Sequence, residues 1–136
     1  MDQPQFTEQV GLGLQKAFEL AKEQGCVEVS PTHLFLAFLK EPADYFSLLC
    51  KESRLDTFFL METLQKTTEA LPRYEKKGQD PVFGQKISHL FSSAQKLIKE
   101  WKDSYISVDH LFFLFVTKEE LSGSIISKKS IYHYQS

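Results

Sequence analysis

The stretch VSPTHLFLAFL, residues 29–39, decides the fold of this chain, and a second copy, ISVDHLFFLFV, follows at residues 106–116. Each copy predicts a helix that begins after a serine, because a serine hydroxyl at the N-cap accepts a hydrogen bond from an N–H of the first turn. The apolar run after each serine is too short to cross a bilayer. A helix that is apolar on every side belongs in a protein core.

The two copies belong to a longer internal repeat with an offset of 77 residues, which places Phe83 on Phe6. No gap is needed to bring caps, histidines and apolar positions into register. The matching pairs are Val10 with Ile87, Leu14 with Phe91, Ala17 with Ala94, Leu20 with Leu97, Ser30 with Ser107, His33 with His110 and Phe38 with Phe115. Such a repeat predicts two similar helical units that pack about a pseudo-two-fold axis around one core.

Apolar spacing within the first unit predicts helices over residues 6–24, 30–40, 43–51 and 56–70, with Asp56 as a cap. The second unit restarts at Phe83 after a polar stretch that contains Gly78 and Pro81. The expected domain is therefore 1–120, with repeat one at 6–71, a linker at 72–82 and repeat two at 83–120. Residues 121–136 hold five serines and no acidic residue, and are expected to form a divergent, poorly ordered tail.

Composition narrows the classes of function. The chain has 136 residues, enough for one domain, and a formal net charge of −2, which argues against nucleic-acid binding. No membrane contact is expected. Cys26 and Cys50 have no metal-ligand spacing, so we expect reduced thiols in a cytoplasmic protein, with no metal and no cofactor.

Three motifs carry a family resemblance: FTE at residues 6–8, LP at 71–72 and, most specifically, DSYISVDHL at 103–111. With these motifs the chain resembles the double Clp-N domain, the N-terminal module of Clp AAA+ chaperones, and in particular the ClpB-type disaggregases. The resemblance covers about residues 6–119. It implies an all-α fold of two pseudo-symmetric repeats with up to four helices each. It also implies capture of apolar segments from unfolded or aggregated client proteins, which an ATP-driven ring then receives.

Two departures from the family are visible in the sequence. No G-x-x-x-x-G-K-[ST] phosphate loop occurs, so we expect no ATPase activity in this chain. The second repeat is expected to be truncated, with its last two helices missing or replaced by the tail. Its apolar surface, including one side of Phe112 and Phe115, would then be uncovered and favour association.

The resemblance also implies which polar residues lie near the client-binding surface: Thr7, Asp103 and Asp109. The position of Asp109 is more often glutamate in the family. A purely structural role also fits the two acids. Asp109 falls in the first turn of a helix, where negative charge interacts favourably with the helix dipole, and Asp103 can cap a turn.

The resemblance places an apolar, sequence-tolerant groove between the two long helices, where the client is expected to bind. Its candidate lining residues are Leu14, Ala17, Leu90 and Leu97. Core packing is the favoured alternative for Leu14 and Ala17. Leu90 lies off the stripe formed by Ile87, Phe91 and Ala94, so we expect it to be exposed. Trp101 is expected at the junction of the repeats.

His33 and His110 are candidates for metal ligands or for an acid–base pair. Each stands alone in its repeat, without a second ligand one helical turn later. We therefore favour two buried histidines that hydrogen-bond near a helix start, and we expect no catalytic residues and no enzyme activity.

The sequence thus predicts the client-binding module of a ClpB-type disaggregase, here without ATPase modules. Three alternatives stay open. The chain could be an accessory protein that docks on a Clp ATPase or protease ring. It could be a small helical enzyme that uses His33 and His110 close together. It could also be a non-functional remnant whose incomplete second repeat does not fold into a packed unit.

Overall fold

The computed structural model describes residues 5–41 and 44–118, which form six helices and two short strands. The helices are α1 (Glu8–Gln24), α2 (Pro31–Leu39), α3 (Tyr45–Glu52), α4 (Thr57–Glu69), α5 (Gln85–Trp101) and α6 (Val108–Thr117); the strands are β1 (Glu28–Val29) and β2 (Val82–Phe83). The predicted all-α class is confirmed. The predicted tail at 121–136 lies outside the described residues.

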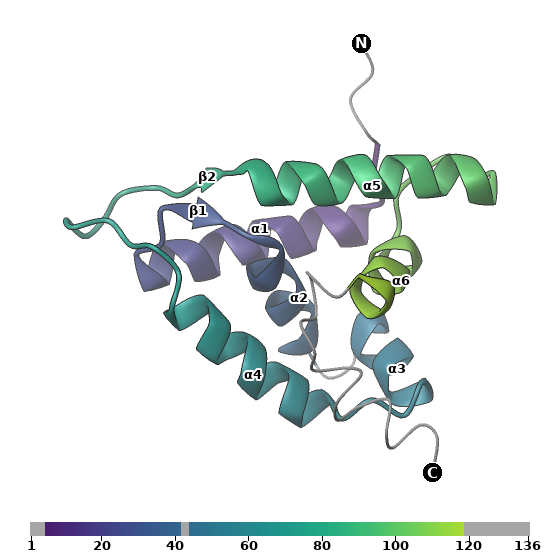
Figure 1. Ribbon diagram of the computed structural model, residues 1–136, viewed down its shortest axis with the longest axis horizontal. Coiled ribbons are helices and arrows are strands. Elements are labelled where there is room, and N and C mark those ends of the chain that lie inside the picture. Colours follow the sequence, from purple (N-terminus) through teal and green to yellow (C-terminus); the bar gives the residue numbers. More distant parts are fainter. Residues whose placement is uncertain (1–4, 42–43, 119–136) are drawn as a thin grey trace.

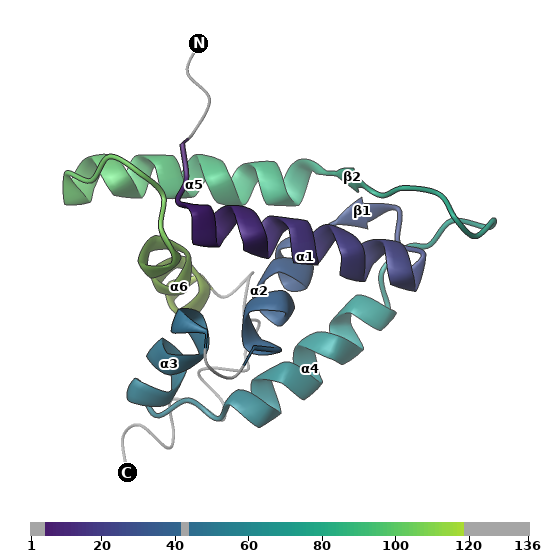
Figure 2. The same ribbon diagram turned by 180° about the vertical axis from the view of Figure 1, so that it is seen from behind.

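The two long helices, α1 and α5, lie side by side and run in opposite directions, with the shorter helices grouped on one side of the pair (Figures 1 and 2). Two ring contacts fix this arrangement. Phe6, just before α1, packs edge-on against Phe91 in α5, and Phe83, just before α5, stacks against Phe18 in α1. The ring centroids are 6.0 Å apart in both pairs. Each long helix is thus held by the segment that leads into the other.

Backbone pairing shows the same pseudo-two-fold relation. Val29 in β1 pairs in parallel with Phe83 in β2, and Ile106 pairs in parallel with Phe6. Adding 77 to Val29 gives Ile106, and adding 77 to Phe6 gives Phe83, so each pairing is the image of the other. Both pairings join one repeat to the other, which explains why two similar helical units form a single core.

The apolar helix α2 lies in that core as predicted, with every residue from His33 to Leu39 buried. An aromatic cluster extends the core across the two repeats. Phe115 of α6 packs against Phe35 of α2, with ring centroids 4.6 Å apart, and against Phe46 of α3, at 5.7 Å. Phe112 also meets Phe46, at 5.6 Å. The expectation that Phe115 is uncovered is therefore wrong, because α3 of repeat one covers it.

Element boundaries follow local capping chemistry. The predicted cap at Asp56 is present, since its carboxylate accepts a hydrogen bond from the Phe59 N–H at 3.0 Å. The third helix begins at Tyr45 rather than at residue 43, because the Asp44 carboxylate accepts from the Tyr45 N–H. The expected linker is partly structured. Arg73 forms an isolated antiparallel backbone pairing with Cys26, and β2 begins at Val82.

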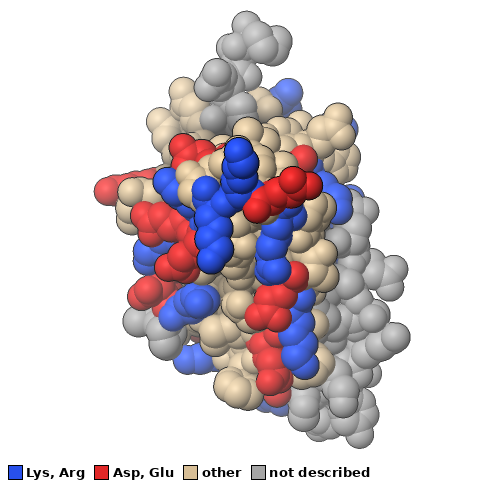
Figure 3. Space-filling view, turned by 90° about the vertical axis from the view of Figure 1, so that its left-hand side faces the viewer, with Lys and Arg blue, Asp and Glu red and all other residues tan. Residues whose placement is uncertain are grey.

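Charges of both signs are interspersed on the face that holds the connector between α4 and β2 (Figure 3). One ion pair ties this connector to α1, with Lys22 Nζ 2.9 Å from Asp80 Oδ1. This face lacks the uniform basic surface on which nucleic-acid binding depends. Within the described ranges, no helix has both the length and the apolar character that a membrane span requires.

Candidate functional site

The serine and histidine at the start of α2 form a reciprocal cap. The His33 N–H donates to Ser30 Oγ at 3.4 Å, and the Ser30 N–H donates to His33 Nδ1 at 3.0 Å. Because a backbone N–H can only donate, Nδ1 is an acceptor and the ring proton sits on Nε2, 3.2 Å from Gln24 Oε1. Burial lowers the pKa of His33 to about 4. The ring is therefore neutral near pH 7.

Repeat two builds the same cap with one change of partner. The Ser107 N–H donates to His110 Nδ1 at 2.9 Å, and His110 Nε2 lies 2.7 Å from Asp103 Oδ2. Both histidines are buried and bonded near a helix start, which confirms the predicted capping role. Each is held by residues of its own repeat, and this geometry is that of two caps rather than of one acid–base pair.

The three polar residues implied by the family resemblance converge on one edge of the molecule. The Thr7 N–H donates to the carbonyl oxygen of Ile106 at 3.0 Å. Asp103 and Asp109 lie three residues before and after Ile106, in the connector between α5 and α6 and at the start of α6. The start of α1 runs beside this connector in both views (Figures 1 and 2).

All three residues also have an internal partner. Thr7 Oγ1 caps α1 by accepting from the Val10 N–H, and Asp103 accepts from His110. Asp109 Oδ1 accepts from the Tyr45 hydroxyl at 2.9 Å, and this hydrogen bond to a carboxylate raises the pKa of Tyr45. Both acids remain exposed to solvent. Their role in client contact stays a prediction.

The aliphatic candidates lie inside the protein. Ala17 and Leu97 are buried, Leu14 is half-buried, and Leu90 is only 2% exposed, so the expectation of an exposed Leu90 is wrong. Leu90 stands three residues after Ile87 and four before Ala94, on the same face of α5. That face is wide because α5 packs against both α2 and α6.

Five exposed aromatic side chains lie on the segments that carry the polar trio or contact them, and sequence spacing alone does not show them. We call this set the aromatic edge; it consists of Phe6, Tyr45, Trp101, Tyr105 and Phe113, each 40–49% exposed. Trp101 packs on His110 and on Phe113, with ring centroids 4.9 and 5.4 Å apart. It therefore lies within repeat two, and its expected place at the repeat junction is wrong.

The two cysteines are buried. Cys26 and Cys50 are free thiols, and burial raises the pKa of both, that of Cys50 to about 12. Within residues 5–41 and 44–118, no group of three or more His, Cys, Asp or Glu side chains could hold a metal ion.

The amino-acid sequence of this chain is similar to those of known proteins. The Clp repeat (R) N-terminal domain model matches residues 5–129. The chain is 26% identical over 125 residues to chaperone protein ClpB 1 of Synechococcus elongatus, covering 92% of this chain and 14% of that protein. It is 31% identical over 110 residues to ClpB of Chlamydia pneumoniae, covering 81% of this chain and 13% of the relative. The chain thus spans about one seventh of these relatives.

Solved structures share the fold. The Hsp104 N-terminal domain from Candida albicans superposes with a TM-score of 0.77 at 20% identity, covering 96% of this chain and 87% of the other. A ClpV N-domain in complex with a VipB peptide gives 0.74 at 21% identity, covering 90% and 76%. The family match includes every described residue, and the repeat of capped helices is present in the fold. The chain belongs to the Clp repeat N-terminal domain family.

Proposed function

We propose that this chain is the client-binding N-terminal module of a ClpB-type chaperone, which captures apolar segments of unfolded or aggregated proteins in the cytoplasm and catalyses no reaction itself. The family membership supports the general role. The observation that carries the proposal is the aromatic edge, which places exposed rings beside the carboxylates of Asp103 and Asp109.

The chemistry of the aromatic edge suits an unfolded client. Aromatic rings contact many kinds of apolar side chain, so they accept varied sequences. Carboxylates beside the rings favour segments that also carry lysine or arginine. Binding by a few half-exposed rings is weak and reversible, as delivery of a client to a motor requires. When the module is tethered to an ATPase ring, even weak capture raises the local concentration of client.

A pair of aromatic substitutions tests the site. Tyr105→Ser removes a ring of the aromatic edge that is 49% exposed, whereas Phe58→Ser removes a ring on α4 that is 72% exposed and outside the edge. The measurement is fluorescence anisotropy of a labelled, permanently unfolded polypeptide titrated with each variant. We expect Tyr105→Ser to weaken binding about fivefold, which corresponds to about 1 kcal/mol, with Phe58→Ser unchanged.

Equal weakening by the two substitutions would mean that any exposed ring contributes and that no defined site exists. Unchanged binding in Tyr105→Ser would move the client away from the aromatic edge. Both side chains are exposed, so both variants are expected to fold, and a thermal melt verifies this before titration.

A further inference from the structure

His110, buried near the start of α6, contacts two residues of the proposed client site. Its Nε2 lies 2.7 Å from Asp103 Oδ2, and the Trp101 ring packs on its imidazole, with ring centroids 4.9 Å apart. His110 is 2% exposed, whereas Trp101 is 41% exposed and the Asp103 side chain is 47% exposed. One buried ring thus holds two side chains that face solvent.

The cap at the start of α6 determines which nitrogen of His110 faces Asp103. The Ser107 N–H donates to Nδ1 at 2.9 Å, so Nδ1 is an acceptor and the ring proton is on Nε2. The Nε2–H group then donates to the Asp103 carboxylate, and a hydrogen bond to an ionised acceptor is stronger than one between neutral groups. A carboxylate accepts several hydrogen bonds, so Asp103 keeps the capacity to accept one from a client.

The backbone of Asp103 is held as well. Lys102 ends α5 in the left-handed conformation, and the Asp103 N–H donates to the carbonyl oxygen of Ile98 at 2.8 Å. This closure of α5 fixes where the Asp103 side chain begins, and His110 fixes the direction of its carboxylate. A side chain that is already ordered in the free protein loses little freedom when a client binds, so this orientation favours affinity.

Repeat one shows that the cap does not require this second contact. At the offset of 77, Gln24 corresponds to Trp101 and Cys26 to Asp103. His33 Nε2 lies 3.2 Å from Gln24 Oε1, in a partly buried hydrogen bond. The capping role is therefore common to both repeats, whereas contact with a half-exposed ring and an exposed carboxylate belongs to repeat two.

We propose that His110 is a positioning residue for client capture, which orients the Asp103 carboxylate and the Trp101 ring toward the client. This role rests on the proposed function of the aromatic edge. It also defines the class of client segment that the site prefers, which carries lysine or arginine beside apolar side chains. The oriented carboxylate pairs with the cation, and the ring contacts the apolar group.

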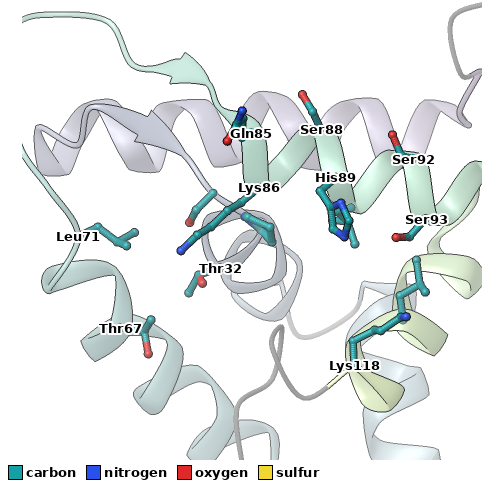
Figure 4. Close-up of a pocket in the computed structure, with 14 residues that line it drawn as sticks. Thr32, Thr67, Leu71, Gln85, Lys86, Ser88, His89, Ser92, Ser93 and Lys118 are labelled. Atoms are coloured by element: carbon teal, nitrogen blue, oxygen red, sulfur yellow. The ribbon is translucent and has the colours of Figure 1, made fainter.

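A groove elsewhere on the surface is the alternative place for such a segment. It has a volume of about 710 Å³ and lies between α5, the end of α6 and the start of α2. Thr32, His89 and Ser93 are among the residues that line it (Figure 4). His110, the polar trio and the aromatic edge contribute none of its fourteen described lining residues. A client bound in this groove would not depend on the orientation of Asp103.

The probes are two labelled peptides, one with two lysines that flank two leucines and one with glutamine in place of each lysine. Fluorescence anisotropy gives the ratio of their affinities, which we call the lysine preference. His110→Asn keeps an acceptor for the Ser107 N–H, because asparagine Oδ1 takes the place of Nδ1, but it has no donor where Nε2 was. We expect a preference of about tenfold in the parent chain, lowered about fivefold by His110→Asn. His33→Asn makes the same change in repeat one and should leave the preference unchanged.

Three further measurements separate positioning from folding. Asp103→Asn should lower the lysine preference as His110→Asn does, and the double variant should lower it no further, because both changes remove the same oriented carboxylate. His110→Gln loses the acceptor for the cap but places an amide N–H near the position of Nε2, so it should restore most of the preference in a less stable protein. Trp101 is the only tryptophan of the chain, and acrylamide should quench its fluorescence more strongly in His110→Asn than in His33→Asn.

The outcomes distinguish this role from the proposed function. A thermal melt verifies that each variant folds. An unchanged lysine preference in His110→Asn, or losses that add in the double variant, would overturn the positioning role. If Tyr105→Ser still weakens binding of the unfolded polypeptide, the aromatic edge remains the client site and the positioning role alone fails. If the parent chain has no lysine preference and Tyr105→Ser has no effect, both proposals fail together.

Discussion

Gly25 and Lys102 end the two long helices in the same left-handed conformation, with φ of 74° and 60°. They stand 77 residues apart, so the repeat preserves the backbone conformation while the residue type differs. Glycine adopts this conformation without steric cost, whereas a side chain brings Cβ close to the carbonyl oxygen.

We therefore expect Lys102→Gly to raise the free energy of unfolding by about 0.5–1 kcal/mol, and Gly25→Ala to lower it by about 1 kcal/mol. Urea denaturation of both variants beside the parent chain checks this. A loss of stability in Lys102→Gly would mean that the lysine side chain makes a contribution larger than its backbone strain.

His33 makes stability depend on pH. Its pKa falls from the usual 6.5 to about 4 on folding, because burial disfavours the charged ring. Below pH 6.5 the unfolded chain binds the proton more readily than the folded chain, so stability falls as the pH drops from 6.5 toward 4.

This single residue should lower the free energy of unfolding by about 2–3 kcal/mol between pH 7 and about pH 4.5. Urea denaturation at both pH values measures the effect. His33→Gln lacks the titrating group and should show a shallower pH dependence, despite lower stability at pH 7. An equally steep dependence in His33→Gln would assign the effect to other groups.

At the scale of an element, α1 approaches α2 closely because residue 13 is glycine. A Cβ at Gly13 would lie 2.5 Å from Phe38 Cε1 and 2.8 Å from Phe38 Cζ. Phe38 is buried and stacks against Phe46, with ring centroids 5.2 Å apart, so a shift of its ring would disturb this packing. A Cβ at Gly11, on the same helix, would meet only the Phe6 ring, at 3.4 Å from Cε1 and 3.8 Å from Cδ1.

The two glycines make a matched pair. Gly13→Ala should lower the free energy of unfolding by about 1–2 kcal/mol, because overpacking outweighs the gain in helix propensity. Gly11→Ala should raise it by up to about 1 kcal/mol, because only the propensity changes. Thermal melts of the two variants measure these changes. A stabilised Gly13→Ala would show that the close packing of α1 against Phe38 does not require glycine.

At the scale of the whole molecule, Phe46 joins the repeats, since it lies in α3 of the first and packs against Phe112 and Phe115 of the second. Removing the ring leaves a cavity between the units. We expect Phe46→Ala to cost about 3–5 kcal/mol, in one cooperative transition that near-UV and far-UV circular dichroism report together. Two separate transitions would show that the repeats unfold independently.

Sequence spacing predicted what is local or repeated. The serine caps, the buried α2 and the offset of 77 are recognisable because residue type and position agree in both units. The prediction for Leu90 was wrong because it allowed α5 only a narrow buried face, whereas α5 packs against two helices, α2 and α6. The aromatic edge could not be predicted, since residues such as Tyr45 and Asp109 meet only through tertiary packing.

The pairing of Phe6 with Ile106 also has a consequence for synthesis on the ribosome. Phe6 finds its backbone partner 100 residues later, so this pairing cannot form until nearly all of the described residues have been translated. Closing so long a loop carries a large entropic cost that the completed second unit must offset. During translation the first unit therefore stays open at that end, so a chain truncated before Ile106 should be cleaved by a protease near Phe6 more readily than the full sequence.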